Sequence, residues 1–121
     1  MSFAAWIGVA LLGGAGAMAR FLLDGTVSRR AGRDLPVGTF TVNVSGAFLL
    51  GLLAGVSLRG DALVLLGGAA LGSFTTFSTW MFETQRLTEE GETRGAATNA
   101  ALSLAVGLGA VALGRLIGNH L

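Results

Sequence analysis

The chain has 121 residues, of which 52% are hydrophobic and only 12% are charged, with a formal net charge of +1. Soluble domains of this size usually carry about twice that share of charge, so the composition favours an integral membrane protein. The lack of cysteine excludes disulfides and thiolate metal sites, and the single histidine, His120, argues against a histidine-based metal site. The near-neutral charge argues against nucleic acid as a partner.

Four apolar stretches follow one another, each about as long as an α-helix that crosses a bilayer. They lie at about residues 3–23, 37–58, 62–82 and 96–117. We therefore predict an all-α membrane protein whose four transmembrane helices form a single domain, residues 1–121. Residues 1–18 contain no basic side chain, so the first stretch is expected to be a retained span and not a signal peptide. Residues 24–35 and 83–94 are expected to be loops, and Pro36 fits a helix start.

Small residues four positions apart recur in the predicted spans. The pairs and triplets are Ala10 and Gly14, Gly51 and Gly55, Gly68 and Gly72, and Ala110, Gly114 and Gly118. Such spacing is typical of helices that pack closely in a membrane, where small side chains let backbones approach. The pattern predicts a helix bundle and says nothing of its function.

Polar side chains inside the spans are the candidate functional groups, because they are costly in a bilayer. In the second span Thr39 and Asn43 share one helix face, where they can bond to another helix or line a pathway. In the third span residues 72–79 place five hydroxyls and two aromatic rings close together. Hydroxyl side chains beside glycine weaken a helix, so a break is predicted there. A broken helix at membrane depth must be buried in protein or line a polar cavity, which indicates an ion or substrate pathway.

Three segments carry a specific resemblance: GGAGAMARF at 13–21, PVGTFTVNVSGAFLLG at 36–51 and GSFTTFSTWMFE at 72–83. In this order and spacing, the chain resembles the Fluc (CrcB) family of fluoride channels over all four predicted helices. The resemblance implies an antiparallel, dual-topology dimer with two pores in the cell (plasma) membrane. It implies passive, fluoride-selective export that lowers cytoplasmic fluoride and its toxicity, and no enzymatic activity. The implied partners are fluoride, the lipid bilayer and a second subunit.

The resemblance also assigns roles to individual residues. The implied fluoride-pore residues are Asn43, Phe77, Ser78, Thr79, Trp80, Ser103 and Thr39, with Thr76 in the same hydroxyl-rich strip. Arg20 is implied at the aqueous vestibule. The backbone carbonyls of Gly72 and Thr75 are implied to hold a structural sodium ion at the dimer interface, together with those of the second subunit.

The chemistry of these residues suits a small, strongly hydrated anion. The Asn43 amide and the hydroxyls are compact donors that can replace water, and the ring edge of Phe77 is electropositive. The predicted spans contain no acidic residue except Glu83 at a helix end, which favours a passive channel over a proton-coupled pump. Two positions depart from the family pattern: Trp80 stands where a second pore phenylalanine is usual, and Asn99 where a tyrosine is common.

The arginines are unevenly divided between the two sides of the predicted bundle. One side carries Arg20, Arg29, Arg30, Arg33, Arg86 and Arg94, and the other carries Arg59 and Arg115. This bias predicts that the arginine-rich side faces the cytoplasm, with both termini outside. A subunit that inserts both ways should be nearly balanced, so pairing with an oppositely oriented paralogue is hypothesised, with a homodimer as the alternative.

Two other functions compete with the channel. A small four-helix multidrug exporter has a similar size, but such proteins depend on a glutamate in the first helix, and residues 3–23 contain no acid. The second competitor is a non-conducting or half-conducting subunit that supports a partner channel. The presence of Asn43 and Phe77 favours retained pore chemistry.

Overall fold

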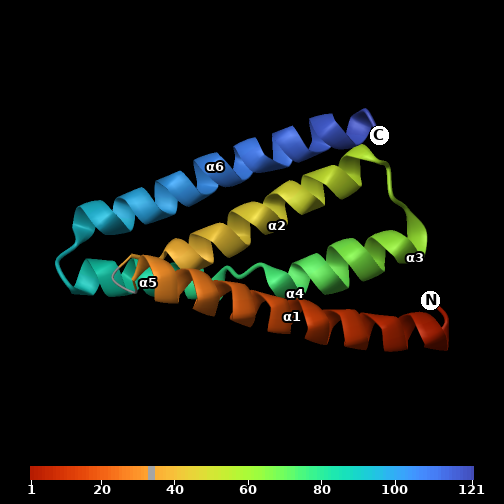
Figure 1. Ribbon diagram of the computed structural model, residues 1–121, viewed down its shortest axis with the longest axis horizontal. Helices are drawn as coiled ribbons and strands as arrows, with labels where there is room; N and C mark the ends of the chain where they lie inside the picture. Colours follow the sequence, from red (N-terminus) through yellow and green to blue (C-terminus); the bar gives the residue numbers. More distant parts are fainter. Residues whose placement is uncertain (33–34) are drawn as a thin grey trace.

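The computed structural model describes residues 1–32 and 35–121, and its regular secondary structure is helical throughout them. The elements are α1 (Phe3–Ala31), α2 (Val37–Gly55), α3 (Gly60–Leu63), η1 (Val64–Leu71), α4 (Gly72–Phe74), α5 (Ser78–Glu89) and α6 (Thr93–Asn119). The elements α3, η1, α4 and α5 follow one another as the third span, Gly60–Glu89. Within these described residues, four helices are thus long and apolar enough to cross a membrane, as predicted. Both termini lie at one end of the elongated bundle (Figure 1).

The prediction that residues 24–35 form a loop is wrong for most of that segment, because α1 continues to Ala31. Short polar side chains bond along this part of the helix: the Thr26 hydroxyl donates to the Leu22 carbonyl, and the Ser28 hydroxyl donates to Asp24. The helix ends where Gly32 adopts a φ of +88°, a conformation that glycine reaches without steric cost. Arg33 lies outside the described residues.

The second predicted loop, residues 83–94, is also mostly helical. Helix α5 runs to Glu89 and α6 begins at Thr93, so the two helices are joined by residues 90–92. A polar sequence can remain helical when its charges lie at helix ends in water, and the Arg86–Glu90 ion pair one turn apart supports this segment. The predicted helix start at Pro36 is confirmed, because its carbonyl accepts the N–H of Phe40 at 3.1 Å.

Helix α2 lies in the middle of the bundle and packs along α6, its principal neighbour (Figure 1). A Cβ atom added at Gly51 would overlap the carbonyl of Val111, and one added at Gly114 would overlap the carbonyl of Phe48. The backbones of the two helices are therefore in direct contact through glycine. This confirms the predicted close packing for α2 and α6.

The third span is irregular in two places. Its first half is a π-helix, η1, which the sequence did not predict, and it breaks at residues 75–77, where a break was predicted. Thr75 has an extended backbone, with ψ of 159°. Helix α1 packs against η1 and α4, and Gly16 of α1 meets the carbonyl of Ala70.

The chain buries few large side chains. Val42 of α2 is fully buried, whereas Phe21, Phe77 and Leu108 are each at least 70% exposed. A soluble monomer rarely leaves so much apolar surface in water. This surface is suited to lipid or to a second subunit.

Candidate functional site

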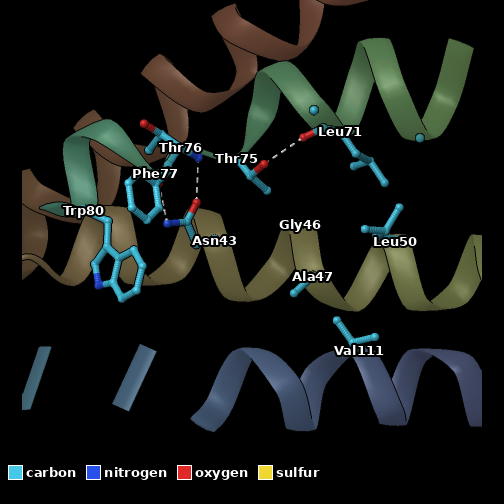
Figure 2. A pocket seen from close by; sticks show the side chains of 12 residues that line it. Asn43, Gly46, Ala47, Leu50, Leu71, Thr75, Thr76, Phe77, Trp80 and Val111 are labelled. Atoms are coloured by element: carbon cyan, nitrogen blue, oxygen red, sulfur yellow. Dashed lines mark hydrogen bonds between the residues drawn. The ribbon is translucent and has the colours of Figure 1, made fainter. Parts of the chain in front are cut away.

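Asn43 provides hydrogen bonds to the backbone at the break in the third span. Its side chain projects from α2 toward the break, where Oδ1 accepts the Thr76 N–H and Nδ2 donates to the Thr76 carbonyl, both at 2.8 Å (Figure 2). Both backbone groups of Thr76 are thereby satisfied by one side-chain amide. The two bonds hold the non-helical backbone at a fixed distance from α2, as a buried polar backbone requires.

The same arrangement releases backbone carbonyls of the third span, among them those of Gly72 and Thr75. In a continuous helix the N–H of Thr76 would donate to the Gly72 carbonyl, and that of Thr79 to the Thr75 carbonyl. Here the Thr76 N–H donates to Asn43 Oδ1, and the Thr79 N–H donates to Thr76 Oγ1 at 3.3 Å. Gly72 and Thr75 therefore lose their helical donors, and their oxygens are available to another partner.

A cavity of about 320 Å³ adjoins the break. Its walls come from α2, the third span and Val111 of α6, and its polar groups gather around Thr75 and Thr76 (Figure 2). Six of the residues assigned from the resemblance line it: Asn43, Gly72, Thr75, Thr76, Phe77 and Trp80. The tertiary structure thus brings the implied pore amide, the two aromatic rings and the two implied sodium-binding positions to one cavity.

Phe77 and Trp80 form an aromatic pair beside the break. Their ring centroids are 5.6 Å apart with the planes at 77°, an edge-to-face arrangement. Phe77 is 70% exposed, whereas Trp80 is half-buried between α5 and α6. The indole N–H of Trp80 donates to the carbonyl of Asn99 at 3.3 Å. That donor is therefore occupied within the chain.

Thr39 lies outside the cavity and bonds to an acid that the sequence analysis placed only at a helix end. Its buried hydroxyl donates to Glu83 Oε1 on α5. Nearby on α1, Asp24 lies so close to α2 that a Cβ on Gly38 would overlap its carboxylate. Two acids thus lie within helices that extend beyond the predicted spans. Because Thr39 and Asn43 are four residues apart, the sequence predicted that they share one face of the helix. Both side chains do bond to the third span.

The remaining assigned residues are placed as follows. The Ser103 hydroxyl on α6 is buried and has no hydrogen-bond partner among the described residues. Thr79 is half-buried and its hydroxyl bonds to that of Thr76, while Ser78 is exposed. Arg20 is partly exposed on α1. Within 1–32 and 35–121, no three His, Asp or Glu side chains are grouped as metal ligands would be.

Sequence reasoning missed Thr84 as a partner of the aromatic pair. Its hydroxyl accepts from the Asn99 side chain at 2.8 Å, between α5 and α6. The available signal was its spacing, because Thr84 follows Trp80 by four residues and so lies on the same helix face. Because residue 84 was predicted to lie in a loop, the shared helix face with Trp80 was not recognised.

Comparisons with known proteins agree with this geometry. The family described as CrcB-like protein, Camphor Resistance (CrcB) matches residues 7–115. The chain is 52% identical over 112 residues to "Fluoride-specific ion channel FluC 2" of Mycolicibacterium paratuberculosis, covering 93% of this chain and 92% of the relative. It is 44% identical over 119 residues to "Fluoride-specific ion channel FluC 1" of Symbiobacterium thermophilum, covering 93% and 96%. With a match over nearly its whole length and relatives of this similarity, the chain belongs to the CrcB family.

Proposed function

We propose that this chain is a subunit of a fluoride-selective channel, which lets fluoride leave the cell passively and so lowers cytoplasmic fluoride and its toxicity. The observation that carries the proposal is the Asn43 amide fixed at a helix break, beside Phe77 and next to a cavity. The relatives named fluoride-specific ion channels support the choice of ion. In this role the protein is a channel and not an enzyme.

The donors at the site suit a small anion. Asn43 Nδ2 carries two hydrogens, and only one is needed for the Thr76 carbonyl. The other is available to fluoride. The Ser103 hydroxyl does not line the cavity beside Asn43, but it is buried without a partner in the described part of the chain and is proposed as a further donor along the pathway. Phe77 can present its electropositive ring edge to the same ion. Ser78, Thr79 and Arg20 are proposed to line the approach to this point, whereas Thr39 is buried and donates its hydroxyl proton to Glu83.

A second subunit completes the pore in this proposal. The Phe77 ring is 70% exposed, although it lies beside the break near the middle of the third span. An added Cβ at Gly14 or Gly68 meets no described atom within 4 Å, so these two small residues of the predicted pattern leave room for another helix. An antiparallel dimer would cover this surface and place two breaks side by side.

The dimer interface is proposed to hold a structural sodium ion. The carbonyls of Gly72 and Thr75 have lost their helical donors, and carbonyl oxygens are ligands that a hard cation prefers. Two oxygens from one chain are too few for such an ion, so the second subunit would supply the rest. When bound, the sodium would neutralise the exposed carbonyl dipoles and join the two breaks.

Whether the proposed dimer contains one or two kinds of subunit depends on the orientation that this chain adopts in the membrane. Relatives are named both FluC 1 and FluC 2, and the arginine bias favours one orientation in the plasma membrane, with the arginine-rich end in the cytoplasm. A heterodimer with an oppositely oriented paralogue is therefore proposed beside the homodimer. In the heterodimer this chain would contribute one share of each pore.

The long α1 does contain an acid, Asp24, which bears on the multidrug-exporter alternative. Its carboxylate accepts the Ser28 hydroxyl at 3.1 Å and lies against Gly38, close to the end of the helix. An exporter of that kind needs a carboxylate at membrane depth, open to substrate. The position of Asp24 therefore favours the channel.

Anion efflux from liposomes that contain the purified chain tests the proposal. Fluoride should leave rapidly and chloride should not, and Asn43→Asp or Phe77→Ile should abolish the fluoride flux. Asn119→Asp, at the exposed end of α6, is the matched control and should conduct like the parent. Equal fluoride and chloride flux would contradict the proposal. Silence from folded protein would favour the heterodimer, which co-reconstitution with a paralogue would then test.

A further inference from the structure

Three residues are linked in a closed ring of hydrogen bonds between α5 and α6, in which two of the three acceptors are backbone carbonyls. The Trp80 indole N–H donates to the Asn99 carbonyl at 3.3 Å, and Asn99 Nδ2 donates to the Thr84 hydroxyl at 2.8 Å. The Thr84 hydroxyl in turn donates to the Trp80 carbonyl at 2.8 Å. Each of the three residues is therefore both a donor and an acceptor, and the chain of bonds returns to its starting residue.

Such a closed ring is more rigid than its separate bonds. The Thr84 hydroxyl alone would make an ordinary bond to its own helix, but here it also accepts from α6. The Thr84 hydroxyl donates and accepts at once, so its two bonds strengthen each other in a medium of low dielectric. All three residues are at least half-buried, so water competes weakly with these bonds. The ring consequently fixes the Trp80 side chain relative to α6.

The ring determines which surface Trp80 presents to the cavity. Since the indole N–H is directed to the Asn99 carbonyl, that donor is not available to an anion. The indole instead meets Phe77 edge to face, at 5.6 Å between centroids. Phe77 is 70% exposed, and Trp80 is its one aromatic partner among the described residues.

We propose that Trp80, Thr84 and Asn99 form a positioning unit that holds the Phe77 ring and thereby sets the discrimination between fluoride and larger anions. The proposal rests on the proposed channel function. Both positions that depart from the family pattern belong to this unit: the Trp80 indole donates to the backbone carbonyl of Asn99, and the Asn99 side chain donates to Thr84.

Hydrogen exchange of the indole N–H tests the ring without any assay of transport. The chain has two tryptophans, and Trp6, which is 60% exposed, is an internal reference. With ¹⁵N-labelled tryptophan in the wild-type protein, the Trp80 indole should exchange at least about tenfold more slowly than that of Trp6. Exchange of Trp80 as fast as Trp6 would overturn the proposal, and this result needs no variant.

Variants at Thr84 then test the link to selectivity. Thr84→Val keeps the shape but removes the hydroxyl, and should lower the fluoride-to-chloride flux ratio at least about fivefold. Thr84→Ser restores the hydroxyl and should restore both the ratio and the slow exchange. Thr88→Val is the matched control, because the Thr88 hydroxyl bonds only within α5 and is exposed.

The outcomes separate this proposal from the channel function itself. A wild-type protein that protects the Trp80 indole but conducts no fluoride, either alone or co-reconstituted with a paralogue, would contradict the channel function alone. A Thr84→Val protein that exchanges its indole rapidly but keeps the wild-type flux ratio would overturn the positioning role. If Thr84→Val does not fold, Asn99→Leu, which removes the same donor to Thr84, is expected to give the same loss of the ratio, and an unchanged ratio contradicts the proposal.

Discussion

The α2–α6 contact and the break in the third span differ in how the backbone is paired with its surroundings. In the first, glycines such as Gly51 and Gly114 let the two backbones touch, and no side chain is needed. In the second, the backbone has lost its own partners, and side chains such as Asn43 and Thr76 replace them. The contact holds the helices in place, and the break carries the chemistry.

This difference predicts two kinds of sensitivity. A glycine contact tolerates no added volume, because the neighbouring atoms are backbone and cannot move aside. A break tolerates changes of shape better than the loss of a donor or an acceptor, because an unpaired buried polar group is destabilising. The free energy of unfolding of single variants in mixed micelles can separate these two responses.

The largest effect is expected at the glycine contact. In Gly114→Ala the new methyl group overlaps the Phe48 carbonyl and forces α2 and α6 apart, which should lower the free energy of unfolding by about 3 kcal/mol. Gly109→Ala is the control on the same helix, since its added Cβ meets no described atom within 4 Å. Equal stability of the two variants would contradict the backbone contact.

The second effect concerns the break. Asn43→Leu leaves the N–H and the carbonyl of Thr76 unpaired, so the free energy of unfolding should fall by about 2–3 kcal/mol. Ser45→Ala is the control on α2, because the Ser45 hydroxyl bonds only to carbonyls of its own helix. An Asn43→Leu protein as stable as Ser45→Ala would show that the amide does not hold the break.

A smaller effect is expected from the start of α5. Thr76→Val removes the hydroxyl that accepts the Thr79 N–H, and the loss of such a cap destabilises by about 1 kcal/mol. Thr76→Ser should retain most of this stability. Thr41→Val, whose hydroxyl bonds only to the Val37 carbonyl, provides the baseline. A loss in Thr76→Val no greater than this baseline would argue against the cap.

The smallest effect on stability is expected at the end of α5, which lies outside both the glycine contact and the break. Arg86→Gln removes the partly exposed ion pair with Glu90, 3.2 Å long, and should lower the free energy of unfolding by only about 0.3–0.5 kcal/mol. The difference should vanish at high salt, because exposed charges are screened. A loss that persists in 1 M salt, a concentration at which the screening length is about 3 Å, would contradict a purely exposed pair.

The candidate site was partly predictable from the sequence. Costly polar residues in apolar spans identified Asn43 and the hydroxyl-rich run, and the weak helix in that run predicted the break. The bond from Asn43 to Thr76 was not predictable, because it joins residues 33 positions apart. The roles of Thr84 and Glu83 were hidden because polar composition was interpreted as a loop.

The sequence alone determined the number of spans, the helical class and the glycine faces of α2 and α6, since each follows from local hydropathy and residue size. Only the tertiary structure decided which partners the polar groups take: Thr39 with Glu83, Asn43 with Thr76, and Trp80 with Asn99. A polar side chain inside an apolar bundle must find a donor or acceptor, but several are within reach of a given helix face. The packing of the helices determines which partner is met, and local sequence does not specify that packing.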